Sequence, residues 1–194
     1  MAGLSVDSEL VERAIRDEPG ARDRLLEASL PAVLTWTTRL GGPKVDPEDA
    51  AHDALMIVWT KLDALRSPQR YSAWLYGIVR RVLAAHRRRA WVKRWVPGVD
   101  PELASERSAT PAAEAESSEL IRGVQEALEK LPPKQREVLV LCELEERTDV
   151  EVAEMLGVPL GTVKSRLRLA RARFAQAASR LKLDRGLSAH KEGA

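Results

Sequence analysis

Apolar residues recur at intervals of three and four along most of the chain, and no segment shows a sustained alternation of period two. This pattern predicts an all-α protein. In the first half it indicates one helix that starts at Asp7 or Ser8 and stops at Pro19-Gly20. Three more helices are expected at about residues 22–40, 46–62 and 72–95, separated by Gly41-Gly42-Pro43 and by the loop RSPQRY.

The pattern lapses after Pro97 and resumes near Ser118. Residues 97–117 are rich in Pro, Ser, Ala and acidic side chains, which is typical of a flexible acidic linker. Four further helices are expected at about residues 120–131, 132–144 and 148–156 and from Gly157 onward. The third has capping-box spacing between Thr148 and Glu151. The sequence therefore predicts two small helical bundles, at 1–96 and 118–183, followed by a tail at 184–194.

The last helix carries the most informative pattern. On a helical wheel Val163, Leu167, Ala170 and Phe174 form one narrow apolar face, while Ser165, Arg168 and Leu169 lie opposite, and the stretch Gly157–Phe174 has no acidic residue. A short helix, a glycine-bearing turn and a basic second helix are typical of a helix-turn-helix unit that enters the DNA major groove. The alternative is an ordinary charged, solvated helix face, which the one-sided charge disfavours.

Composition narrows the remaining possibilities. A single cysteine, Cys142, excludes an intrachain disulfide and favours a reducing compartment; it is expected in the core, as are Trp59 and Trp74. The chain shows neither a secretory signal nor an apolar run of about 18 residues, so we expect no membrane insertion and a cytoplasmic location. No metal-ligand set and no nucleophile–base set is visible, so we expect no metal, no cofactor and no enzymatic activity.

Several stretches together resemble one known family. LEKLPPKQREVLVLCELEERTDVEVAEMLGVPLGTVKSRLRLAR is similar to region 4 of bacterial sigma-70 factors of the extracytoplasmic-function (ECF) group. DPEDAAHDALMIVWTKLDAL resembles regions 2.1–2.2 of the same group, and YSAWLYGIVRRVLAAHRRR resembles regions 2.3 and 2.4. The order of two domains with a short linker matches the minimal architecture of that group, and the resemblance covers nearly the whole chain.

The resemblance implies a sigma factor that binds core RNA polymerase (the β and β′ subunits) and promoter DNA, under the control of an anti-sigma factor in a stress or environmental response. It also implies site residues at matching positions. For core polymerase these are Asp49, His52, Asp53 and Met56. For the −10 element they are Arg66, Gln69, Arg70, Tyr71, Arg80, Arg81, Arg87, Arg88 and Arg89. For the −35 element they are Thr162, Lys164, Ser165, Arg168, Leu169 and Arg171.

The chain departs from the family pattern at a few of these positions. His52 replaces the usual Gln, Arg81 the usual Asn and Ala85 a common Asp. Leu169 stands where Arg is frequent, and a leucine can touch a thymine methyl group but cannot hydrogen-bond to a base. Two other functions stay open at this point: a stand-alone helix-turn-helix regulator that uses only the second domain, and an interaction module whose basic faces bind an acidic protein.

Overall fold

The structure, a computed structural model, describes residues 6–93 and 114–181. The expected tail at 184–194 and the expected linker as far as residue 113 lie outside these ranges. In the described ranges every regular element is helical, as the periodicity predicts. Three positive-φ glycines, Gly20, Gly42 and Gly157, stand at helix boundaries.

The first domain consists of α1 (Ser8–Ile15), α2 (Ala21–Gly41), α3 (Pro47–Lys61) and α4 (Tyr71–Lys93), with short 3₁₀ turns η1 (Leu62–Ala64) and η2 (Pro68–Arg70) between α3 and α4. Side-chain caps start two of these helices. The Asp7 carboxylate accepts a hydrogen bond from the backbone N–H of Glu9, and Asp46 accepts from those of Glu48 and Asp49. Trp36 and Tyr76 meet edge to face in the core, with ring centroids 5.1 Å apart.

The second domain consists of α5 (Glu114–Glu129), α6 (Pro133–Leu139), α7 (Asp149–Leu156) and α8 (Leu160–Arg180). A π-helical turn, η3 (Val140–Leu144), continues directly from α6. The helix α5 begins at Glu114, before the expected domain boundary at 118, so residues 114–117 are helical. The capping box of Thr148 and Glu151 is confirmed, and Gly157 ends α7 at φ 64°.

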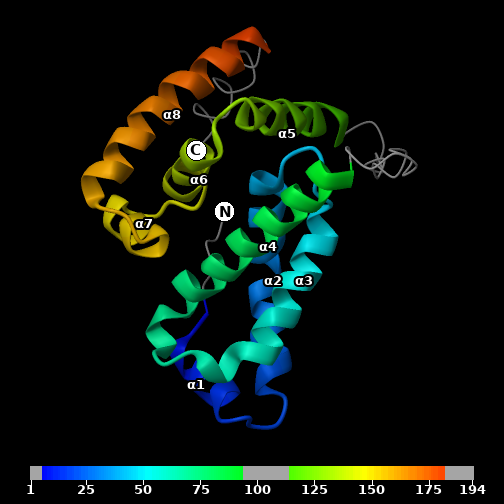
Figure 1. Cartoon of the computed structure of the whole chain (residues 1–194), viewed down its shortest axis with the longest axis vertical. Coiled ribbons are helices and arrows are strands. Elements are labelled where there is room, and N and C mark those ends of the chain that lie inside the picture. Colours follow the sequence, from blue (N-terminus) through cyan, green and yellow to red (C-terminus); the bar gives the residue numbers. More distant parts are fainter. Residues whose placement is uncertain (1–5, 94–113, 182–194) are drawn as a thin grey trace.

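The two domains are not separate bodies (Figure 1). Helix α4 contacts α7, and α2 contacts α6. One cluster of buried apolar residues runs through both domains, from Val11 in α1 to Ala170 in α8. Within the described residues, no helix is both long enough and apolar enough to cross a membrane.

Candidate nucleic-acid interface

The apolar stripe that the helical wheel predicts on α8 packs the helix-turn-helix unit of α7 and α8 against the rest of the second domain. Val163, Leu167 and Ala170 are buried, and Phe174 is half-buried at the end of the stripe. Since these side chains hold one face of α8 against the domain, the opposite face is presented to solvent. The capping box and the left-handed Gly157 set the angle between the two helices.

The outward face of α8 carries the residues that are expected to read duplex DNA. Lys164, Ser165 and Arg168 are exposed, and Thr162 is half-exposed. Leu169 is 41% exposed, which leaves its methyl groups free for apolar contact. The Ser165 hydroxyl donates to the carbonyl oxygen of Thr162 at 3.0 Å, so that it keeps its lone pairs for an incoming donor.

Arg171 differs from its neighbours on α8 because a carboxylate already holds it. Its Nη2 and Nε lie 2.5 and 2.8 Å from Oε1 of Glu143, and the hydrogen bond and charge of Glu143 raise the pKa of the Arg171 guanidinium. By contrast, Lys164 and Arg168 have no hydrogen-bond or ion-pair partner among the residues that the structure covers. The basic charge offered to DNA is therefore concentrated at the N-terminal half of α8.

The four residues expected to bind polymerase lie along α3. Asp49 and His52 are exposed, Asp53 is half-exposed, and Met56 is 50% exposed. Trp59 lies one turn beyond Met56 and is 40% exposed. The expectation of a core role for Trp59 is thus wrong, and the i, i+3 spacing of Met56 and Trp59 was the signal for an exposed apolar pair.

Asp53 also connects α3 to the basic helix α4. Its Oδ2 lies 2.8 Å from Nε2 of His86 and 3.8 Å from Nη1 of Arg89. Arg89 and Arg88 are otherwise exposed on the same helix, as is Arg81. The face expected to bind polymerase and the helix expected to bind DNA are therefore in direct contact.

A groove of about 250 Å³ opens where η2 meets α4, and it is lined by Val6, Ser8, Pro68, Gln69, Tyr71 and Ser72. Its lining includes Ser72, whose Oγ is buried and has no hydrogen-bond partner in the described structure. A buried hydroxyl without a partner is costly unless a ligand or water satisfies it. Gln69 adds an amide at the rim, and Arg66 and Arg70 are exposed on the same loop.

Tyr71 has a different place from the one expected of a DNA-contacting residue. It is only 2% exposed, and its hydroxyl lies 2.8 Å from Oγ of Ser29 in α2. Burial raises the pKa of Tyr71 to about 12. Because the ring and the hydroxyl are committed to the core, Tyr71 forms the floor of the groove, and we leave it out of the proposed set of DNA-binding residues.

Two arginines of α4 are already engaged. Nε of Arg80 donates to Oε1 of Glu137 in α6 at 2.5 Å, and Nη1 of Arg87 donates to the carbonyl oxygen of Leu40 at 3.0 Å. Among the positions expected at the −10 element, other side chains engage the polar groups of Tyr71 (Ser29), Gln69 (Ser67) and Arg80 (Glu137), and Asp53 lies more loosely, at 3.8 Å, beside Arg89. In the described parts of the chain, no group of His, Cys, Asp and Glu is arranged to hold a metal ion.

Two segments of the chain match known families. Residues 25–92 match the family described as Sigma-70 region 2, and residues 121–174 match the family described as Sigma-70, region 4. The first match spans α2, α3 and α4 with the groove, and the second spans the helix-turn-helix unit.

Similar proteins cover nearly the full length. The ECF RNA polymerase sigma factor RpoE of Cereibacter sphaeroides is 31% identical over 173 residues, which are 84% of this chain and 91% of that protein. Among solved structures, CnrH in complex with the cytosolic domain of CnrY has a TM-score of 0.65 at 25% identity and covers 89% of this chain and 97% of its own. The sigma factor RpoE of Bartonella quintana, in complex with the anti-sigma factor NepR, has a TM-score of 0.64 at 26% identity and covers 82% and 98%.

Proposed function

Because this chain belongs to the ECF group of sigma-70 RNA polymerase sigma factors, we propose that it binds core RNA polymerase and directs it to promoters through two DNA contacts. The second domain docks on the −35 duplex, and the first domain opens and holds the −10 element. The main support for assigning the −10 element to the first domain is the groove beside η2, where the buried Ser72 hydroxyl has no hydrogen-bond partner in the described structure.

The −35 contact uses the exposed face of α8. Lys164, near the helix N-terminus, enters the major groove and hydrogen-bonds to a base, and Arg168 one turn later binds a phosphate. Leu169 lies against a thymine methyl group, which is the base contact that an aliphatic side chain makes. The Thr162 hydroxyl adds a contact to the DNA backbone, the lone pairs of the Ser165 hydroxyl accept from a donor on a base edge, and Arg171 joins them once it leaves Glu143.

The −10 contact combines a base pocket with a basic surface. A base that is flipped out of the duplex enters the groove and takes a hydrogen bond from the Ser72 or Gln69 side chain, which offsets part of the few kcal/mol that unstacking costs. Arg66 and Arg70 on the rim bind the phosphates on either side of it. The exposed arginines of α4, namely Arg81, Arg87, Arg88 and Arg89, continue the phosphate track, and Arg80 does so when Glu137 releases it.

The polymerase contact uses the face of α3. Asp49 and His52 supply polar contacts, and Met56 with Trp59 supplies the apolar centre that a specific protein interface requires. The β′ subunit is the expected partner, with β nearby. Because Asp53 of α3 is bonded to His86 of α4, binding of polymerase at α3 affects α4, the helix that holds the −10 strand.

We also propose that an anti-sigma factor controls the protein. Support comes from the solved relative in complex with NepR, which shares this fold over most of both chains. Recovery of the protein from its own cells with a stoichiometric partner that blocks transcription supports this proposal. Constitutive transcription together with the absence of such a partner contradicts it.

The test of the main proposal is transcription in vitro with bacterial core RNA polymerase and a library of genomic DNA fragments. We expect new transcripts that start a fixed distance downstream of shared −35 and −10 sequences. The variant Met56→Ala should weaken binding to core polymerase and reduce all transcripts alike. Leu30→Ala is the matched control, because Leu30 is a similarly exposed apolar residue (40%, against 50% for Met56) on a different helix, α2.

Two results contradict the proposal. If the protein binds particular duplex sequences but core polymerase never initiates at them, it is a stand-alone helix-turn-helix regulator. If it binds DNA without any sequence preference, the basic faces serve another acidic partner. In both cases Met56→Ala and Leu30→Ala have the same effect.

A further inference from the structure

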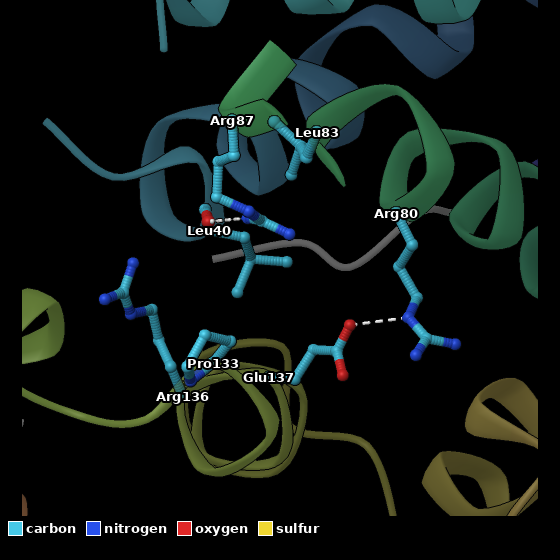
Figure 2. Close-up of a pocket in the computed structure, with 7 residues that line it drawn as sticks. All are labelled: Leu40, Arg80, Leu83, Arg87, Pro133, Arg136 and Glu137. Atoms are coloured by element: carbon cyan, nitrogen blue, oxygen red, sulfur yellow. Dashed lines mark hydrogen bonds and ion pairs between the residues drawn. The ribbon is translucent and has the colours of Figure 1, made fainter. Parts of the chain in front are cut away.

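The contact between the two domains is made partly by charged groups whose other proposed role is to bind DNA. Glu137 of α6 accepts from Nε of Arg80 of α4 at 2.5 Å, and its side chain is 15% exposed. Figure 2 shows this pair facing each other between α4 and α6, with Arg87 beside it on α4 and Arg136 turned away toward the other side of α6. Glu137 is thus an acidic group set among basic ones.

The packing around this pair is close. The space between Leu40, Arg80, Leu83, Arg87, Pro133, Arg136 and Glu137 is about 20 Å³, which is room for about one water molecule. Two further bonds cross the same boundary. Nε2 of Gln125 donates to the carbonyl oxygen of Thr38 at 2.8 Å, and Nη1 of Arg39 lies 3.3 Å from Oε1 of Glu145. The closed arrangement is therefore a built interface with apolar, polar and charged parts.

The second ion pair between the domains, Arg39–Glu145, is partly buried, and this limits what it contributes to the stability of the interface. Burial lowers the pKa of Arg39 and raises the pKa of Glu145, and in each case the partner's charge opposes the shift without cancelling it. Burial therefore penalises both charged forms more than their attraction favours them. The attraction within this pair is therefore not what holds the domains together, and its geometry serves to fix how they meet.

We propose that this interface is autoinhibitory, and that Glu137 occupies the position at Arg80 that a phosphate of the −10 strand takes when the protein opens. The inference rests on the proposed function in one respect, namely that Arg80 is a DNA contact. A carboxylate and a phosphate make the same kind of charge-assisted bond to a guanidinium, so they compete for it. With Glu137 in place, α7 also packs against α4.

The test measures closure and DNA binding separately in the full chain. Fluorescent labels are attached to cysteines placed at the exposed positions Ala28 in α2 and Ala175 in α8, in a Cys142→Ala background. Energy transfer between them reports the distance between the domains without DNA or polymerase. A single-stranded DNA of twelve mixed nucleotides reports binding to phosphates, because that contact is independent of sequence.

Glu137→Gln should lower the transfer efficiency and tighten binding of the oligonucleotide by about threefold to tenfold, as loss of one partly buried ion pair allows. Glu126→Gln is the charge-matched control, since Glu126 is exposed on α5, and it should change neither reading. As a second way to open the interface, Arg39→Glu should lower the transfer efficiency, and the swap Arg39→Glu with Glu145→Arg should restore it. Melting curves show that each variant is folded.

The proposal is overturned if Glu137→Gln leaves both readings at the wild-type values. It is also overturned if transfer efficiency falls while affinity for the oligonucleotide stays the same, because Glu137 then closes the domains without competing with DNA. A failure of the wild-type protein to support transcription counts against the proposed function alone, since energy transfer requires no promoter.

Discussion

The hydroxyl group of Tyr71 offers a direct test of whether this residue serves the core or the DNA. The Ser29 hydroxyl donates its proton to the carbonyl oxygen of Leu25 at 2.7 Å, so the Tyr71 hydroxyl must be the donor in the 2.8 Å bond to Ser29 Oγ. Tyr71→Phe removes this donor and leaves Ser29 bonded to Leu25. We therefore expect the free energy of unfolding to fall by about 1 kcal/mol.

Ser29→Ala is the complementary change, and it should cost more. It leaves the Tyr71 hydroxyl, on a residue that is 2% exposed, without a partner, and such a group costs about 1–3 kcal/mol. The double variant should be no less stable than Ser29→Ala alone, because the stranded hydroxyl is then absent. Urea unfolding followed by circular dichroism measures all four proteins of this cycle.

Alkaline pH gives a second reading of the same hydroxyl. Burial raises the pKa of Tyr71 to about 12, whereas an unfolded tyrosine loses its proton near pH 10. Between these values the folded state holds a proton that the unfolded state has lost. The free energy of unfolding therefore falls as pH rises, by about 1.4 kcal/mol per pH unit. Tyr71→Phe lacks this loss, so its deficit against wild type should shrink above pH 10 and then reverse.

The reasoning is refuted by one pattern of results. If Tyr71→Phe keeps wild-type stability but loses affinity for a −10 single strand in the polymerase complex, the hydroxyl contacts DNA and not Ser29. The resemblance to the family, which includes Tyr71 among the −10 residues, is then the better guide. Gln69→Ala is the comparison in this assay, since Gln69 is exposed at the rim of the groove and should affect binding without affecting stability.

Three further predictions concern the second domain. Lys164→Ala should weaken −35 binding by about 1–3 kcal/mol and relax the preference at one base pair. Arg168→Ala should weaken binding to all sequences alike and reduce the slope of log affinity against log salt by about one. Fluorescence titrations across salt concentrations measure both effects. Burial, followed by the charge of Asp149, raises the pKa of Cys142 to about 12, so a disulfide reagent at pH 8 should modify the folded protein far more slowly than the urea-unfolded protein. Thr148→Ala removes the capping box of α7 and should lower the free energy of unfolding by about 1 kcal/mol in urea titrations, while Thr148→Ser should retain most of it.

Much of the local structure was predictable because it depends on short-range chemistry. The caps at Asp46 and Thr148, the stop at Gly157 and the buried stripe of α8 each follow from residues within about one or two helical turns of one another. The start of α5 was less predictable, since the Ala- and Glu-rich composition near residue 114 suits both a solvated linker and a helix.

The places of Tyr71 and Trp59 differ from those that the sequence suggests, and both differences come from contacts between distant segments. Tyr71 follows a polar loop and so reads as exposed, and only the arrival of Ser29, 42 positions away, makes it a core residue. Trp59 is hydrophobic enough to be expected in the core, but it is 40% exposed among the residues that the structure describes. Instead Arg22 places its guanidinium 5.9 Å from the ring centroid and donates to the Trp59 carbonyl oxygen, which supports the exposed ring from one side.

Contacts between distant segments also decide which of the basic residues are available to bind DNA. A pattern of arginines predicts an affinity for phosphate, but the available charge depends on which carboxylates reach those arginines first. Glu143 holds Arg171 from within its own domain, whereas Glu137 holds Arg80 across the domain boundary. Release of Arg171 requires only that one exposed side chain turn away. Glu137 is only 15% exposed and stays beside Arg80 as long as the domains are closed, so separation of the domains would release Arg80 and place the −10 contact under the control of the second domain, while Lys164 and Arg168 remain free to bind at −35.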